Sequence, residues 1–146
     1  MHILLRLALL LAACGLVLYG ATGCREPRPE PPGERSAISI SHAVADAVDA
    51  ADRSAADRTL DAGRKPKELL SFFGIARGMR VAELGAAGGY TAELLARIVG
   101  PSGRVYGQNS RFILDRFAAK PWTERLAKPV MANVVRVDAE FDAPLP

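Results

Sequence analysis

The chain has 146 residues, a length that indicates one domain, and its hydrophobic fraction of 49% is ordinary for a globular protein. Its formal net charge is +3, of which residues 1–23 contribute one, so the remainder carries +2 (3 − 1), too little to indicate a nucleic-acid-binding protein. Both cysteines, Cys14 and Cys24, lie near the start, so no internal disulfide is expected in the rest of the chain. His2 and His42 have no partner at metal-ligand spacing, and no metal site is expected.

Residues 1–23 have the pattern of an export signal. A weakly positive start precedes the apolar stretch from Leu7 to Tyr19, and small residues follow it. Ala21-Thr22-Gly23 before Cys24 resembles the lipobox of a bacterial lipoprotein signal peptide. The resemblance implies that Cys24 is the lipid attachment site and that the protein is exported and anchored to a membrane on the periplasmic side.

Other interpretations of this segment stay open. It could be an uncleaved membrane anchor, although a spanning helix needs about 20 apolar residues and this run is shorter. It could also be cleaved as an ordinary export signal. The run from Leu11 to Cys14 also matches the lipobox pattern, but cleavage there would leave the apolar residues 16–18 on the mature protein.

Residues 24–40 are rich in proline and charge and have nothing to bury. Such a segment stays extended and solvated, so we expect a flexible tether that holds a domain away from a membrane surface. The expected domain covers residues 41–146.

Two helices are predicted at the start of this domain. Ser41 caps the first, which runs to about Ala62 with a thin apolar stripe and ends at Gly63. We expect it to pack on the surface of the domain. Pro66 begins the second helix, and Gly74 follows its last turn. The apolar face of the second helix consists of Leu69, Leu70 and Phe73.

Strands and helices then alternate. The predicted elements are a strand over Arg80–Leu84, a helix over Tyr90–Val99, a strand over Arg104–Gly107, a helix that Ser110 caps, and a strand over Asn133–Val137. Leu94, Leu95 and Ile98 form the inward face of the first of these helices. Pro121-Trp122 predicts a break or a new short turn, with Trp122 at the surface or an interface. The alternation predicts an α/β fold whose strands are parallel and joined by right-handed crossovers.

A glycine-rich turn over residues 85–89 joins the first strand to the helix behind it, with Glu83 two residues before the first glycine. Such turns are common by themselves, because tight turns need positive φ or close packing. The dinucleotide fingerprint G-x-G-x-x-G fails, since Ala87 and Tyr90 occupy its second and third glycine positions. The spacing of a phosphate-binding loop fails as well, since no Gly-Lys-Ser/Thr follows.

Together with Glu83, the turn resembles motif I of the class I S-adenosylmethionine-dependent methyltransferases. The motif is acidic-x-Gly-x-Gly-x-Gly, and here Gly85 and Gly89 match its first and last glycines while Ala87 replaces the middle one. Residues 99–107 resemble the connection into the second strand of that family. The similarity is greatest to a group of small exported bacterial predicted methyltransferases, through residues 61–66 and 88–95, and it covers about Lys65 to Pro146.

The resemblance implies a Rossmann-like fold and roles for six cofactor-binding residues: Glu83, Gly85, Ala87, Gly89, Asn109 and Asp138. Glu83 would place negative charge near the methionine end of S-adenosylmethionine, and the turn would lie against the ligand. Asn109 stands where an acidic residue usually binds the ribose hydroxyls, and Asp138 matches the aspartate that faces the adenine amine. Transfer would be an in-line displacement, so positioning is most of the catalysis. Neither catalytic residues nor the methyl acceptor follow from the sequence.

Plainer roles are open for the same residues. Glu83 could cap the following helix, Asn109 and Gln108 could be ordinary turn residues, and Asp138 could be a capping residue without a ligand. Tyr90 and Tyr106 are expected to be packing residues.

The resemblance also implies a further half to the fold, with a fourth strand that the sequence to Pro146 does not contain. We therefore expect a truncated cofactor-binding half, about three strands with flanking helices, whose first strand exposes an edge that could pair with another chain. The alternative is a catalytically inactive, lipid-tethered Rossmann-like binding or remnant domain. A nicotinamide-binding module is a third possibility, which the spacing of the glycines argues against.

Overall fold

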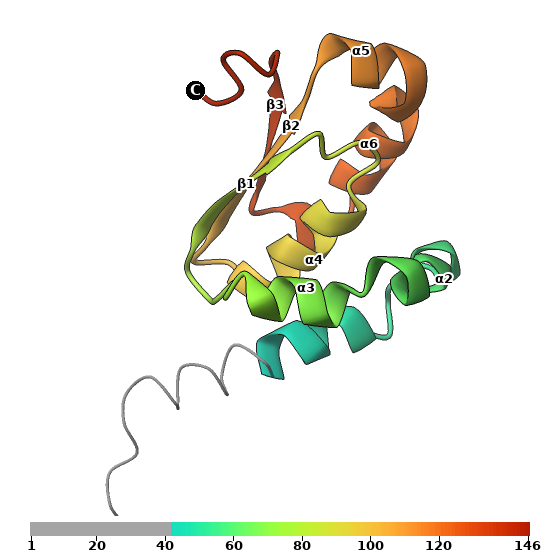
Figure 1. The fold of residues 1–146 in the computed structure, drawn as a ribbon, viewed down its shortest axis with the longest axis vertical. Coiled ribbons are helices and arrows are strands. Elements are labelled where there is room, and N and C mark those ends of the chain that lie inside the picture. Colours follow the sequence, from blue (N-terminus) through green and yellow to red (C-terminus); the bar gives the residue numbers. More distant parts are fainter. Residues whose placement is uncertain (1–41) are drawn as a thin grey trace, which may run out of the picture.

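The structure, a computed structural model, describes residues 42–146 (Figure 1). The signal segment, Cys24 and the tether lie outside the described residues. After a helix at residues 42–49, the elements are α2 (Ala55–Arg64), α3 (Pro66–Phe72), β1 (Arg80–Leu84), α4 (Tyr90–Val99), β2 (Arg104–Asn109), α5 (Arg111–Ile113), the π-helical turn η1 (Leu114–Ala118), α6 (Ala119–Leu126), the 3-10 turn η2 (Pro129–Met131) and β3 (Val134–Asp138).

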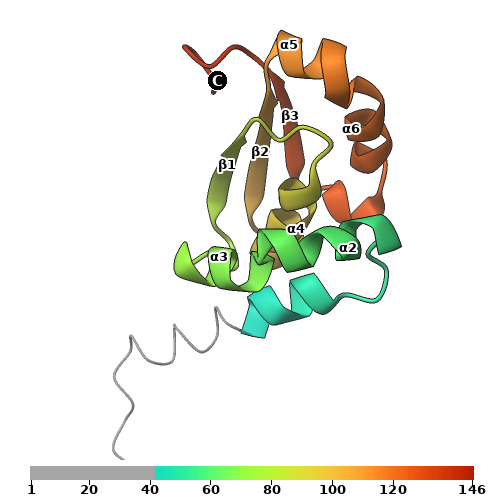
Figure 2. The same cartoon turned by 45° about the vertical axis from the view of Figure 1, so that its right-hand side comes forward.

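The three strands form one parallel sheet in the order β1-β2-β3, which confirms the predicted α/β class (Figure 2). Leu84 pairs with Gln108, and Asn109 pairs with Asp138. This register brings the carboxyl ends of all three strands to one edge of the sheet. The glycine turn leaves the sheet at that same edge, so the residues that the sequence singled out lie together there.

Helix α4 supplies the largest share of the core that covers one face of the sheet. Leu94, Leu95 and Ile98 are buried, as the sequence predicts, and Val105 on β2 is buried with them. Burial alternates along β1, with Val81 and Glu83 turned toward the helices and the other three residues exposed. That alternation is the pattern of a strand with only one covered face.

The single helix predicted from Ser41 to Ala62 is wrong, because the non-helical residues 50–54 separate two helices. In the break, the buried side chain of Arg53 turns inward and donates hydrogen bonds to the Val48 carbonyl (2.5 Å) and to both carboxylate oxygens of Asp61 (2.8 Å each). Ser54 then begins α2 by accepting a hydrogen bond from the Asp57 amide.

The predicted end of that helix at Gly63 is also wrong, since α2 continues to Arg64. Lys65 follows in the left-handed region, with φ of 46°, and its amide donates to the Asp61 carbonyl. Pro66 is then the first residue of α3, as predicted. Of the expected apolar face of this helix, Leu70 is buried, whereas Leu69 and Phe73 are exposed, and all three line one groove.

The expected break at Pro121-Trp122 is wrong as well. Pro121 is the third residue of α6, in its first turn, where a helix tolerates proline. Trp122 is fully buried against the sheet, not at the surface. A Cβ atom added to Gly107 would lie 2.7 Å from the Trp122 ring, so a glycine on β2 makes the space for the indole.

The strand boundaries agree closely with prediction. β1 and α4 have the predicted bounds, and β3 is displaced by one residue, to Val134–Asp138. β2 is two residues longer than predicted because Gln108 and Asn109 continue the pairing with β3. Tyr90 is buried, as expected for a packing residue, and its hydroxyl donates a hydrogen bond to Asp61 (2.6 Å).

Candidate functional site

The turn over residues 85–89 combines three residues with positive φ. Gly85 and Gly89 have φ of 71° and 80°, and Ala87 has φ of 47°. Glycine adopts this region freely, whereas an alanine there is held in a conformation that costs about 1–2 kcal/mol. The turn therefore keeps its tightly curved path at Ala87 because the surrounding structure stabilises it.

Side chains from the end of β2 supply part of that stabilisation. Asn109 accepts a hydrogen bond from the Ala87 amide (2.7 Å) and donates one to the Ala87 carbonyl (3.2 Å). Gln108 accepts one from the Gly85 amide (2.9 Å) and donates one to the Ala139 carbonyl in the segment after β3. Both side chains are fully buried, so they act first as braces of the turn. A ribose contact by Asn109 stays a prediction.

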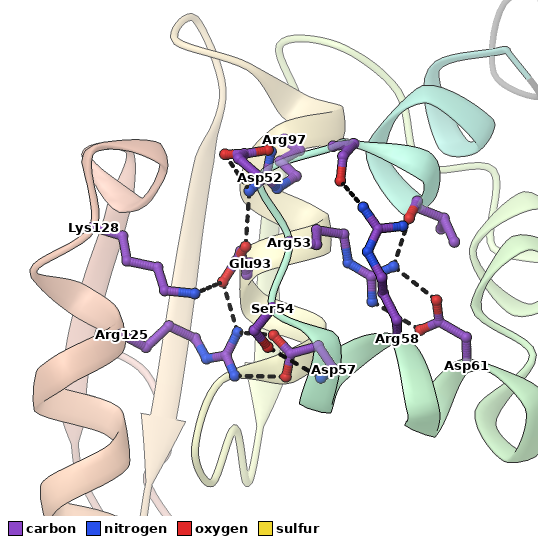
Figure 3. Close-up of polar contacts among 12 residues, drawn as sticks. Asp52, Arg53, Ser54, Asp57, Arg58, Asp61, Glu93, Arg97, Arg125 and Lys128 are labelled. Carbon is purple, nitrogen blue, oxygen red and sulfur yellow. Dashed lines mark hydrogen bonds and ion pairs between the residues drawn. The ribbon is translucent and has the colours of Figure 1, made fainter.

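Arg125 on α6 fixes the far end of the turn, and it was not among the residues predicted for the site. Its Nε donates to the Gly88 carbonyl (2.6 Å). The rest of its guanidinium donates to both carboxylate oxygens of Asp57 (2.7 and 2.8 Å) and to Glu93 (2.6 Å) (Figure 3). No signal in the sequence links Arg125 to Gly88, because 37 positions separate them and the contact exists only once α6 is folded onto the turn.

Glu93, buried on α4, is the centre of a larger charge network. One carboxylate oxygen accepts from Arg97 (2.8 Å), and the other accepts from Arg125 (2.6 Å) and Lys128 (2.8 Å). Arg97 also pairs with the exposed Asp52 (2.8 Å). With Asp57, the network balances three cations against three carboxylates and joins residues 52–57, at the start of α2, to α4 and to the region of α6 (Figure 3).

The network lowers the pKa of its buried carboxyl groups. Hydrogen bonds from Arg125 hold the pKa of Asp57 below its usual value, against the opposing effect of burial. Burial pushes the pKa of Glu93 upward, yet Lys128, Arg97 and Arg125 together overcome it and leave that pKa lowered. Both groups are therefore carboxylates at neutral pH.

Glu83 has a different environment. Its side chain lies on the helix side of β1, beside a groove of about 360 Å³ whose other lining includes Phe73, Val81, Thr91 and Leu95. Among the described residues, no hydrogen-bond partner reaches its enclosed Oε2 atom. Burial raises the pKa of Glu83 to about 7, although Thr91 and nearby arginines oppose the rise. The acid lies behind the turn, close to the first residues of α4.

Asp138 ends β3 and is half exposed. Its carboxylate is paired with Arg136 two residues earlier on the same strand, at 2.8 Å. A ligand amine would have to share this carboxylate with Arg136. The adenine contact therefore stays a prediction for Asp138.

The two glycines of the turn differ in what surrounds them. A Cβ atom at Gly85 would meet Ile113 and Phe141 at ordinary contact distances of 3.7 and 3.8 Å. At Gly89 it would lie 2.4 Å from the Trp122 ring and 2.8 Å from Arg125. Gly89 is therefore required by the packing of α6, whereas Gly85 borders more open space.

In residues 42–146, no cluster of His, Cys, Asp and Glu side chains is arranged to hold a metal ion. No helix of that part of the chain has the length and apolar character needed to cross a membrane. In comparisons with known proteins, no family, no curated protein and no solved structure matches the chain.

Proposed function

We propose that the domain binds S-adenosylmethionine at the carboxyl-terminal edge of the sheet, as the Rossmann-like cofactor half of a methyltransferase. The observation that carries the proposal is the turn between β1 and α4, in which residues 85, 87 and 89 have positive φ at the edge where all three parallel strands end. Ligands of open parallel sheets bind outside this edge, where the main chain can approach them closely.

The start of α4 supports the proposal. Gly89 caps this ten-residue helix and has no side chain of its own to bind the first amides, of which that of Ala92 interacts with Glu83. Those amides carry partial positive charge and favour an anion, which suits the carboxylate of the cofactor's methionine tail. Glu83 behind the turn would offset the positive charge of the sulfonium and ammonium groups.

The remaining proposed contacts come from the ends of β2 and β3. The Asn109 carbonyl oxygen has a second lone pair beside the one that the Ala87 amide uses, and because the side chain is fully buried, a ribose hydroxyl would reach it only after the turn moves. Asp138 would accept from the adenine amine while it keeps Arg136. In the reaction, a nucleophile of the acceptor bonds to the methyl carbon as the carbon–sulfur bond breaks and its electron pair returns to sulfur. The described residues assign neither a catalytic base nor an acceptor.

Calorimetry with S-adenosylhomocysteine and S-adenosylmethionine tests the proposal. The full chain is expected to bind both, and NAD is expected to give no heat. Gly85→Arg should abolish binding, because a long side chain at φ of 71° would fill the space beside Ile113 and Phe141. Gly63→Arg is the matched control, since a side chain at that helical position meets nothing within 4 Å.

Asp138→Ala should weaken binding about tenfold, as expected for the loss of one charge-assisted hydrogen bond. Absence of cofactor heat from a folded wild-type chain would overturn the proposal. Binding that is indifferent to both Gly85→Arg and Asp138→Ala would place the cofactor elsewhere.

A binding or remnant domain without catalysis is the second candidate. It is favoured by the fact that Gln108, Asn109 and Arg125 all direct their polar groups at the main chain of the turn, as a structural brace would. This candidate predicts a folded chain with no heat from S-adenosylmethionine.

Attachment to a membrane through Cys24 is part of both candidates. Metabolic labelling with a palmitate analogue in a bacterial host tests it. Cys24→Ser should abolish labelling and Cys14→Ser should retain it. The opposite result would move the attachment site to Cys14, and labelling of neither form would leave an unlipidated export signal or anchor.

A further inference from the structure

We infer that Arg125 is a positioning residue that couples the docking of helix α2 to the conformation of the glycine turn. The inference deepens the proposed function, because it assigns a control element to the same turn, and it rests on that function only where cofactor affinity is the measurement.

The coupling runs through one guanidinium group. Arg125 is largely buried, with 15% of its side chain exposed, and besides Glu93 its donors bind two other regions of the chain. Nε holds the Gly88 carbonyl in the turn, while Nη1 and Nη2 hold the two oxygens of Asp57 on α2. Because the guanidinium is planar and rigid, fixing one edge on Asp57 fixes the direction of Nε as well.

Asp57 is itself held in place by the way α2 begins. Its amide donates to the Ser54 hydroxyl (3.0 Å) that caps the helix, and its carboxylate lies in the first turn, where the helix dipole favours negative charge. Glu93 supports the guanidinium from a second direction, at 2.6 Å. Asp57 thus transmits the position of α2 to Arg125, and Arg125 transmits it to Gly88.

Side chains from two different elements, β2 and α6, therefore hold the main chain of the turn. Asn109 binds the main chain at Ala87, and Arg125 binds it at Gly88 and packs its Cδ atom against Gly89. Loss of the Arg125 contact would leave the second half of the turn held by the Gly89–Ala86 main-chain hydrogen bond and the packing of Trp122. By linkage, a ligand that orders the turn must also tighten α2 against the domain.

Amide hydrogen exchange on the full chain tests the coupling, because Ala86, Ala87 and Gly89 each donate a main-chain hydrogen bond within the turn or to the end of β2. Asp57→Asn is expected to speed exchange at Gly89 about tenfold relative to the core amides of β2, the effect of losing one charge-assisted hydrogen bond. Asp52→Asn is the matched control: it removes a carboxylate–arginine pair from the same segment, but its partner Arg97 does not touch the turn.

Arg125→Lys separates positioning from stability. A lysine keeps the positive charge beside Asp57 and Glu93, yet its single ammonium group lacks the planar fork that spans Asp57 and the Gly88 carbonyl. Global stability should recover relative to Arg125→Gln, while fast exchange at Gly89 persists. Equal exchange at Gly89 in Asp57→Asn and Asp52→Asn, or wild-type exchange there in Arg125→Lys, would overturn the inference.

Cofactor affinity supplies the second readout. If the wild-type chain binds S-adenosylhomocysteine, Asp57→Asn should weaken binding about three- to tenfold and Asp52→Asn should leave it within about twofold. Equal affinity in wild type and Asp57→Asn would overturn the role of the coupling in binding. A wild-type chain that binds no cofactor contradicts the proposed function, and the exchange measurements then decide the coupling by themselves.

Discussion

Helix α4 separates two acidic side chains whose surroundings are opposite. On the side of α2 and α6, Glu93 lies among Arg97, Arg125 and Lys128 and accepts a hydrogen bond from each. On the side of β1 and α3, Glu83 lies beside an apolar groove, and among the described residues nothing donates to its Oε2 atom. The first carboxyl group has a lowered pKa, and the second has a pKa raised to about 7.

The difference shows that burial alone does not decide the charge state of an acid. Burial raises the pKa in both cases. Hydrogen bonds from three cations overcome it at Glu93, whereas the attraction of nearby arginines does not overcome it at Glu83. The Glu93 side of α4 therefore holds the charge-balanced network of three carboxylates and three cations between helices, which we call the joint: Asp52, Asp57, Glu93, Arg97, Arg125 and Lys128. The Glu83 side keeps an acid whose charged form burial disfavours, and a cationic ligand beside it, such as the proposed cofactor, would lower its pKa.

Replacing Glu93, the centre of the joint, should have the largest effect on the free energy of unfolding. Glu93→Ala leaves three cations without their shared partner, and we expect a loss of about 3–5 kcal/mol in the free energy of unfolding. Urea denaturation at neutral pH measures it. Glu124→Ala is the matched control, because that helical glutamate is 65% exposed and its pair with Lys120 spans 3.9 Å. Equal losses in the two variants would show that the joint is not balanced as described.

Glu83 should make the stability of the fold depend on pH near neutrality. The pKa of Glu83 is about 7 in the folded chain against a usual 4.5, so the folded state binds the proton more tightly. Its contribution is fully present below about pH 4.5 and is lost as the pH rises through 7, a change of about 3 kcal/mol. Glu83→Gln should remove this part of the pH profile, measured by denaturation between pH 4 and 8. Superimposable profiles would contradict the raised pKa.

The joint should respond to acid in the opposite direction. The pKa values of Asp57 and Glu93 are lowered in the folded chain, so their contribution is present above the usual values of 3.8 and 4.5 and is lost as the pH falls through the folded values. Asp57→Asn should flatten the acid limb of the stability profile below pH 4.5 and leave the limb near pH 7 unchanged. A variant whose acid limb matches that of the wild type would show that Asp57 does not gain its charge partners on folding.

The smallest effect is expected from an exposed pair. Lys67 and Asp49 lie 2.7 Å apart with 47% and 64% of their side chains exposed, so water screens the attraction. Lys67→Ala should change the free energy of unfolding by less than about 1 kcal/mol, and salt should reduce the change further. A larger loss would mean that this pair, unlike the joint around Glu93, was misjudged from its exposure.

Local pattern was enough to predict the elements that lead into the site. β1 and α4 have their predicted bounds because apolar spacing defines the strand and the helix, and residues 85–89 interrupt them. The start of α3 at Pro66 and the cap at Ser110 follow from the same short-range chemistry. Six site candidates come from a motif resemblance, and the register explains why Glu83, Asn109 and Asp138 share one edge of the sheet.

Contacts between distant residues decided the rest. The inward turn of Arg53 splits a predicted helix, Trp122 is buried because Gly89 and Gly107 leave space for its ring, and Arg125 reaches Gly88 across 37 positions. None of these has a local signature, because a side chain's burial and partners depend on which elements pack against it. Local sequence specifies where a strand, a turn and a helix begin. Only the packing of these elements decides that Glu93 accepts hydrogen bonds from cations and that the Oε2 atom of Glu83 has no partner among the described residues.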